Sequence, residues 1–161
     1  GGLYGFVWKR FMPELCGLLA FGVGGAALGY STSGDMSWKV WLAGIAISMP
    51  FAVSWSADQL ADAKSDIERG VHNIGGLLYQ TGLPLGLYIL AGGLMSFLVL
   101  LLAIQAGALS VWTGLAFATA PLWVLCAAWL YKDLQRGVRW GLIAIFLFQV
   151  LVVAGQAVEA A

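Results

Sequence analysis

The chain has 161 residues, of which 61% are hydrophobic and only 10% are charged, and its mean hydropathy is +0.88. An ordinary soluble domain has roughly 25% charged residues, so this composition excludes a disordered chain and a disulfide-rich secreted scaffold and argues against a water-soluble domain. Eight Lys and Arg residues balance eight Asp and Glu residues, which leaves no basic field for nucleic acid. Cys16 and Cys126 both lie in apolar runs and are predicted to be small packing residues rather than metal ligands or disulfide partners.

Five apolar stretches approach or exceed the length of helix, about 20 residues, that crosses a bilayer core. In chain order they are residues 13–30, 38–55, 83–106, 111–130 and 138–154. Their only charges, Glu14, Lys39 and Arg139, lie near span ends, and no cleavage-site pattern follows the first stretch. The sequence therefore predicts an all-α, polytopic membrane bundle of about five transmembrane helices, in a single domain over residues 1–161.

Small residues and prolines are expected to affect how closely these spans pack and how straight they are. The first span is rich in Gly and Ala, and Gly86, Gly92 and Gly93 give the third span a small surface, so we expect neighbouring helices to approach both closely. Pro50 and Pro121 are expected to kink or open the second and fourth spans.

The cations are distributed very unevenly over the connections. With five spans, the N-terminal segment, the segment around residues 56–82 and the segment 131–139 lie on one side. That side carries Lys9, Arg10, Lys64, Arg69, Lys132, Arg136 and Arg139, whereas the other side carries only Lys39. Because cytoplasmic loops are enriched in Lys and Arg, we expect the first side to be cytoplasmic and the C-terminus to lie on the opposite side.

A row of acidic residues follows the second span. Asp58, Asp62 and Asp66 are spaced four residues apart, which places three carboxylates on one side of a helix. Like charges at this spacing repel, and a hard cation such as Mg²⁺, which prefers carboxylate oxygens and retains water or phosphate oxygens, would neutralise them. The plainer interpretation is a solvated cytoplasmic loop assisted by Lys64 and Arg69. We favour a site for Mg²⁺ and a diphosphate, because half of the acidic residues lie between Asp58 and Glu68.

Other polar residues near this row have two interpretations each. His72, the only histidine, is a candidate ligand or acid–base group, although an interfacial hydrogen bond is its more ordinary role. Arg69, Lys132, Arg136 and Arg139 could converge on phosphate groups, or simply hold their loops on the cytoplasmic side. The chain has no GxSxG, P-loop, HExxH or CxxC motif, and span centres without charges argue against a pump or transporter.

The acidic row resembles the second aspartate-rich motif of the UbiA superfamily of intramembrane prenyltransferases. The resemblance lies in Asp58-x3-Asp62-x3-Asp66-x3-Gly70 followed by Val71-His72-Asn73, and also in the segment 8–15 with the Gly-rich span after it. It implies a helical bundle around a central cavity, capped on the cytoplasmic side by two aspartate-rich loops that bind Mg²⁺ and the diphosphate of an isoprenyl donor.

Carried onto this sequence, the resemblance makes Asp62 and Asp66 metal ligands and catalytic residues, with Asp58 as a third ligand or an orienting group. It makes Arg69 a catalytic contact to the diphosphate, with Lys64 as the alternative contact. The wider set of candidate substrate-binding residues is Asp58, Lys64, His72, Asn73, Lys132 and Arg136. Phe51, Trp55 and Tyr79 are candidates for shielding an allylic cation, or are ordinary boundary aromatics.

The family's first aspartate-rich motif is absent, and the chain has room for only about half of that bundle. The sequence is then expected to be a fragment, a half completed by a second polypeptide, or a non-catalytic relative. Two functions follow. The first is part of a prenyltransferase that moves an isoprenyl group from a Mg²⁺-bound diphosphate to an aromatic or lipid acceptor. The second is a non-enzymatic membrane subunit of a larger complex that binds pigment or quinone.

Overall fold

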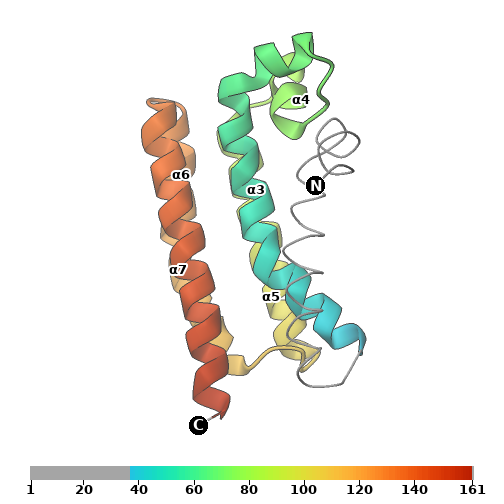
Figure 1. Ribbon diagram of the computed structural model, residues 1–161. Coiled ribbons are helices and arrows are strands. Elements are labelled where there is room, and N and C mark those ends of the chain that lie inside the picture. Colours follow the sequence, from blue (N-terminus) through green and yellow to red (C-terminus); the bar gives the residue numbers. More distant parts are fainter. Residues whose placement is uncertain (1–36, 161) are drawn as a thin grey trace.

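The structure, a computed structural model, describes residues 37–160, apart from the side chains of Ser56, Ala57, Asp58, Ala61 and Ala160 (Figure 1). Five α-helices and one 3₁₀ helix, without any strand, make up this part of the chain. They are α3 Trp38–Glu68, α4 Ile74–Thr81, α5 Leu85–Gln105, η3 Val111–Thr119, α6 Ala120–Leu130 and α7 Leu134–Ala160. The predicted span at residues 13–30, and Cys16 within it, lie outside the described residues.

Three helical segments are long and apolar enough to cross a membrane, which identifies an integral membrane protein. They are Leu85–Gln105, Val111–Leu130 and Leu134–Glu159. These correspond to the third, fourth and fifth predicted spans, and the last begins four residues earlier than predicted. Residues 38–55 are helical, as expected, but form the first part of the longer helix α3 and are not among the three. The all-helical membrane architecture is therefore confirmed over residues 37–160, whereas the count of five spans is not.

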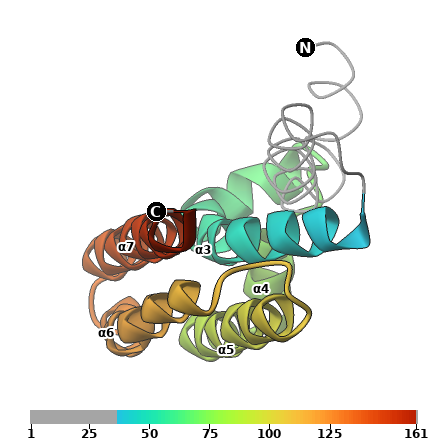
Figure 2. The ribbon, with the colours of Figure 1, turned by 90° about the horizontal axis from the view of Figure 1, so that it is seen from below.

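The long helices form two layers (Figure 2). Helices α3 and α7 make one layer, α5 and α6 make the other, and α6 and α7 form a hairpin. Helix α4 lies at one end of the bundle against the last turns of α3. The interior therefore lies between four helices, and α4 packs on α3 at one end of the bundle.

Two clusters of buried apolar side chains hold the layers together. One includes Val53, Ile89 and Trp123, and the other includes Leu100 and Phe148. Phe97 packs against both; its ring stacks on Phe117 with centroids 5.3 Å apart and lies 6.1 Å from that of Phe148. Trp123 and Cys126 are 2% and 1% exposed, which confirms the prediction that Cys126 is a packing residue.

The small residues of α5 lie where neighbouring helices come closest, as predicted. A Cβ atom on Gly92 would lie 2.7 Å from one methyl group of Val53 in α3 and closer still to the other. A Cβ atom on Gly93 would lie 3.1 Å from the ring of Trp123 in α6. Any side chain at these two positions would push α3 or α6 away from α5.

The two prolines differ in their effects. Pro50 is buried inside α3, where it removes a backbone N–H, and the first turns of α3 run at an angle to the rest of the helix (Figure 1). Pro121 lies in the first turn of α6, where a missing N–H is tolerated. The fourth span changes from 3₁₀ to α geometry at the residue before Pro121.

Candidate functional site

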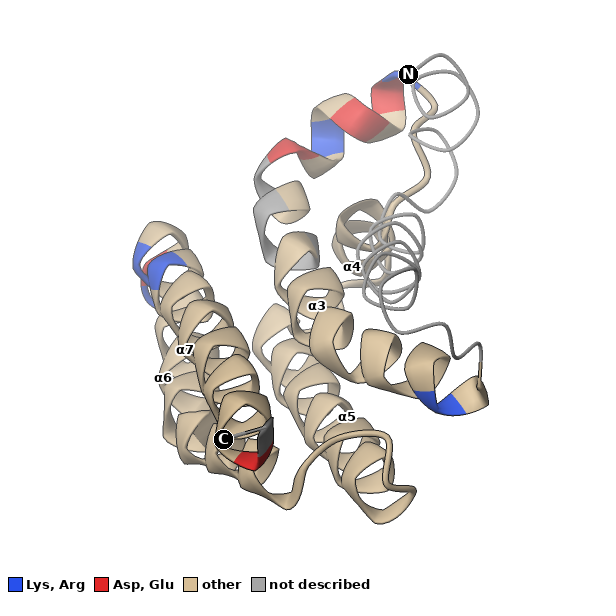
Figure 3. Ribbon diagram, turned by 60° about the horizontal axis from the view of Figure 1, so that its bottom comes forward, with Lys and Arg blue, Asp and Glu red and all other residues tan. Residues whose placement is uncertain are grey.

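The acidic row lies on a continuous helix. α3 extends without interruption from Trp38 to Glu68, so residues 56–68, predicted as part of a cytoplasmic loop, are helical and the loop is a helix–turn–helix ending in α4. Positions 58, 62 and 66 are therefore four residues apart on one helix, whose last turns run at an angle to the part before them (Figure 3). As the spacing predicted, they share one face.

A glycine ends α3 directly after the row. Gly70 adopts a left-handed conformation with φ of +69°. Its N–H donates to the carbonyl of Ile67 at 3.0 Å, and the N–H of Val71 donates to the carbonyl of Asp66 at 2.8 Å. This pair of bonds is the Schellman motif, which favours glycine at the left-handed position. It turns the chain back along α3, so that α4 can pack on it.

Asn73 connects the last aspartate of the row to α4. Its amide nitrogen donates to Oδ2 of Asp66 at 2.8 Å, and its amide oxygen accepts from the N–H of Gly76 at 2.6 Å. The side chain is 6% exposed and caps the N-terminus of α4. A Cβ atom on Gly75 would lie 2.7 Å from the backbone of Gln59, so α4 rests directly on α3. Asp66 is therefore fixed in position by the fold.

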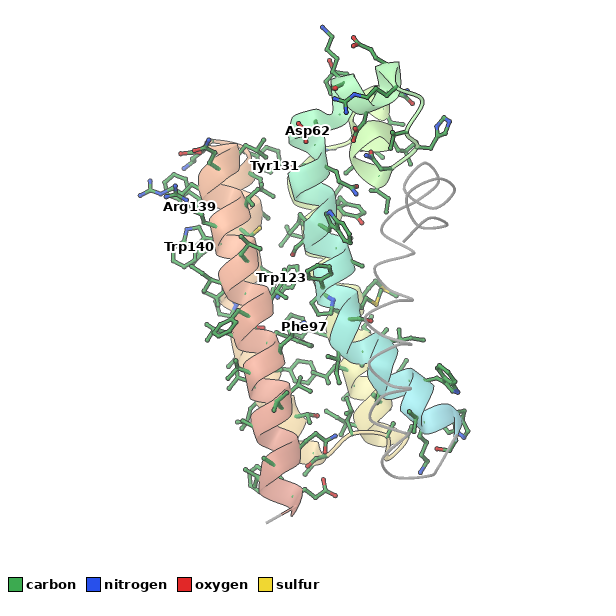
Figure 4. All side chains as sticks on the ribbon, viewed as in Figure 1. Asp62, Phe97, Trp123, Tyr131, Arg139 and Trp140 are labelled. Atoms are coloured by element: carbon green, nitrogen blue, oxygen red, sulfur yellow. The ribbon has the colours of Figure 1, made fainter. Side chains whose placement is uncertain are left out.

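The remaining polar residues of this end are more exposed. Asp62 is exposed near the end of α3 (Figure 4), and so are Lys64 and Arg69. The Arg69 guanidinium donates to the hydroxyl of Ser65, so it lies back along its own helix. His72 is exposed beside a cavity of about 200 Å³ that Asn73 also lines.

The described carboxylates are of the chemical type that a magnesium ion prefers. Mg²⁺ is usually bound by one or two carboxylates and completes its shell with water and phosphate oxygens, and Asp62 and Asp66 offer two on successive turns. Within the described side chains, no three His, Cys, Asp or Glu residues are grouped closely enough to hold a metal ion by themselves. The side chain of Asp58, the predicted third ligand, lies outside the description.

A second cavity, also of about 200 Å³, lies between helices of the bundle. Its lining comes from four helices. It comprises Phe51, Ser54, Trp55, Ile89, Cys126, Val138, Gly141, Leu142 and Ile145. Phe51 and Trp55, two of the predicted cation-shielding aromatics, meet edge to face with centroids 5.4 Å apart. The third, Tyr79, is 56% exposed on α4 and does not line this cavity.

One polar atom in this apolar cavity is unsatisfied. The hydroxyl oxygen of Ser54 is buried and has no hydrogen-bond partner among the described residues. Gly141 leaves space beside it, since a Cβ atom there would lie 3.7 Å from that oxygen and 3.2 Å from the sulfur of Cys126. A buried hydroxyl without a hydrogen-bond partner lowers the stability of the fold, and it marks a place where a polar group of a ligand can bind. Ser54 was not predicted from the sequence, although its place one turn before the acidic row was a usable signal.

The cavity and the acidic row share one face of α3. Phe51, Trp55 and positions 58, 62 and 66 are separated by four, three, four and four residues, which is the repeat of a single helical stripe. By this spacing, the first described carboxylate, Asp62, follows the aromatic cavity wall two turns further along α3.

The predicted phosphate-binding cations of the α6–α7 turn do not lie at the acidic row. The turn and the end of α3 are at the same end of the bundle, but the basic and acidic segments occupy separate parts of the ribbon (Figure 3). Arg139 points away from α3, on the outer side of α7 (Figure 4). Lys132 and Arg136 lie over the ring of Trp129. The structure thus brings Asp66 and Asn73 together, and it does not bring Arg139 to the acidic row.

Comparisons with protein-family models, curated proteins and solved structures found no match to this chain. The likeness to the UbiA superfamily therefore rests on the residues of the acidic row and the segment 8–15.

Proposed function

We propose that this chain supplies one half of an intramembrane prenyltransferase site, in which the acidic end of α3 binds the Mg²⁺-associated diphosphate of an isoprenyl donor. The observation that carries the proposal is the spacing along α3, where the aromatic residues of an apolar cavity precede the carboxylate row on the same helix. A prenyl diphosphate has the same two parts, an apolar tail and a highly charged head, in the same order.

Each part of the stripe has a role in the reaction. The allylic carbon–oxygen bond breaks, its electron pair leaves with the diphosphate, and the acceptor then forms the new carbon bond and loses a proton. Bound Mg²⁺ would supply positive charge against the developing charge of the leaving group. Asp62 and Asp66 would hold it, and Asn73 keeps Asp66 oriented. Phe51 and Trp55 face the developing allyl cation with their rings and exclude water from it.

Two isosteric substitutions test this role. Asp62→Asn and Asp66→Asn remove one charge each, and the amide oxygen introduced at position 66 can still accept the hydrogen bond from Asn73. We expect each to weaken Mg²⁺-dependent binding of a prenyl thiolodiphosphate by at least about tenfold, because an interaction with a charged group is worth roughly 1.5–3 kcal/mol. Glu159→Gln, an exposed carboxylate in the last turns of α7, is the matched control and should leave binding unchanged.

Binding is measured by equilibrium dialysis on the detergent-solubilised chain, together with any polypeptide that co-purifies with it. Diphosphate release from a prenyl diphosphate is measured on the same preparations. Wild-type binding that does not depend on Mg²⁺, or that survives both substitutions, would overturn the proposal. A pigment or quinone found in the purified complex, with no such binding, would favour the non-enzymatic membrane subunit.

A further inference from the structure

The turn between α6 and α7 concentrates positive charge at one end of the bundle. Lys132, Arg136 and Arg139 are all exposed and lie within eight residues (Figure 3). None of the three forms an ion pair with a described residue. The only carboxylate in this segment, Asp133, is engaged with the backbone, since its Oδ1 accepts the N–H of Arg136 at 3.1 Å and begins α7.

Two of these cations are held by one aromatic ring. The guanidinium carbon of Arg136 lies 4.2 Å from the centroid of the Trp129 ring, and the ammonium of Lys132 lies 5.8 Å from it. Cation–π contacts at these distances are attractive. They limit the freedom of both side chains without neutralising their charge, so the cations remain able to bind an anion.

An apolar stripe begins directly beyond Arg139 on α7. Residues spaced three and four apart along the helix are exposed and apolar. They are Ile143, Phe146, Val150 and Val153, with exposed fractions of 44%, 66%, 44% and 65%. Arg139 shares this spacing and points out of the bundle (Figure 4). The stripe belongs to a membrane-spanning helix, so its surroundings include lipid acyl chains.

We propose that the α6–α7 turn is a binding site for an anionic phospholipid of the adjacent leaflet. The lipid phosphate is contacted by Lys132, Arg136 and Arg139, and one acyl chain lies along the stripe below Arg139. Charge complementarity selects the occupant: three cations without an ion-pair partner among the described residues are matched by an anionic headgroup and not by a zwitterionic one. The site is separate from the acidic row and does not depend on the proposed enzymatic role.

The test compares lipids on the full chain in a neutral detergent. Affinities for dioleoyl phosphatidylglycerol and dioleoyl phosphatidylcholine are measured by native mass spectrometry, and the thermal shift that each lipid causes is followed by tryptophan fluorescence. We expect tighter binding of the anionic lipid, and about a fivefold loss of affinity for each cation removed in Lys132→Gln, Arg136→Gln and Arg139→Gln. Arg139→Lys, which keeps the charge, should retain most of the affinity.

Lys39 provides the matched control. It is exposed at the start of α3, at the opposite end of the bundle (Figure 3), so Lys39→Gln should leave the affinity unchanged. Glycerol phosphate, which has the headgroup chemistry without acyl chains, should cause no thermal shift at the same concentration. Equal affinity for the two lipids, an effect of Lys39→Gln equal to that of Arg139→Gln, or an equal shift with glycerol phosphate would each overturn the proposal.

Discussion

Asn73 shows how one side chain can fix both a helix and a candidate ligand. Its two amide atoms bind Asp66 and the first turn of α4, respectively. A carboxylate held in this way loses little conformational entropy when it binds a metal, because its rotamer is already restricted. Local order at α4 and the geometry of Asp66 should therefore change together.

We predict that Asn73→Ala destabilises α4 by about 1 kcal/mol, which is typical for the loss of an N-cap. The measurement is hydrogen–deuterium exchange over residues 74–81, which should become faster relative to α5. Asn73→Ser keeps a capping hydroxyl but loses the bond to Asp66, so it should restore protection of α4. Equal exchange in Asn73→Ala and the wild type would contradict the role of Asn73 as a cap.

The sequence alone predicted part of this arrangement. Spacing was sufficient to place the three aspartates on one helix face, because the geometry of a helix is regular. The bond from Asn73 to Asp66 was not predictable in this way, because it forms across a turn whose path depends on the left-handed backbone at Gly70. Asn73 was predicted to touch substrate, whereas the structure gives both of its amide atoms partners within the protein.

At the scale of elements, hydropathy predicted the third, fourth and fifth spans, but not how each helix continues. Residues 111–130 match the prediction, because the length of an apolar stretch can be read directly from the sequence. The 3₁₀ geometry of residues 111–119 was not predictable, because hydropathy does not distinguish 3₁₀ from α helices; its N-cap is Ser110, whose hydroxyl accepts the N–H of Trp112 at 3.2 Å. Likewise, the polarity change after Trp55 marks the end of an apolar stretch and not the end of α3.

The contact between α3 and α5 gives a prediction at this scale. Gly92→Ala would place a methyl group within 2.7 Å of both methyl groups of Val53, so the helices must separate. Overpacking of this kind typically costs about 1–3 kcal/mol, and we expect a lower unfolding temperature in detergent. Gly114→Ala is the control, because the nearest atoms to its Cβ are 3.9 Å away.

A second substitution separates packing from helix propensity. Val53→Ala removes the methyl groups that obstruct Gly92→Ala, so the double variant should be less destabilised than the sum of the two single variants. Strictly additive effects would show that the two residues do not meet as described.

For the whole molecule, charge distinguishes the two ends of the bundle. The acidic end of α3 and the basic α6–α7 turn lie at one end, and Lys39 and Glu159 lie at the other (Figure 3). Most charges of the described residues therefore border the membrane on a single side, as the loop count predicted. This arrangement would place the proposed diphosphate and phospholipid sites in the same leaflet region.

The positive-inside rule gives an expectation for which end faces the cytoplasm. We predict that the end with Lys132 is cytoplasmic and that the end with Lys39 is not. The measurement is labelling by a membrane-impermeant maleimide of single-cysteine variants, Lys132→Cys and Lys39→Cys, in a background in which Cys16 and Cys126 are replaced by alanine. Lys39→Cys should react in intact cells, and Lys132→Cys only after the membrane is opened. The reverse pattern would contradict the charge rule for this chain, and reaction of both from one side would contradict the placement of the two residues at opposite ends of the bundle.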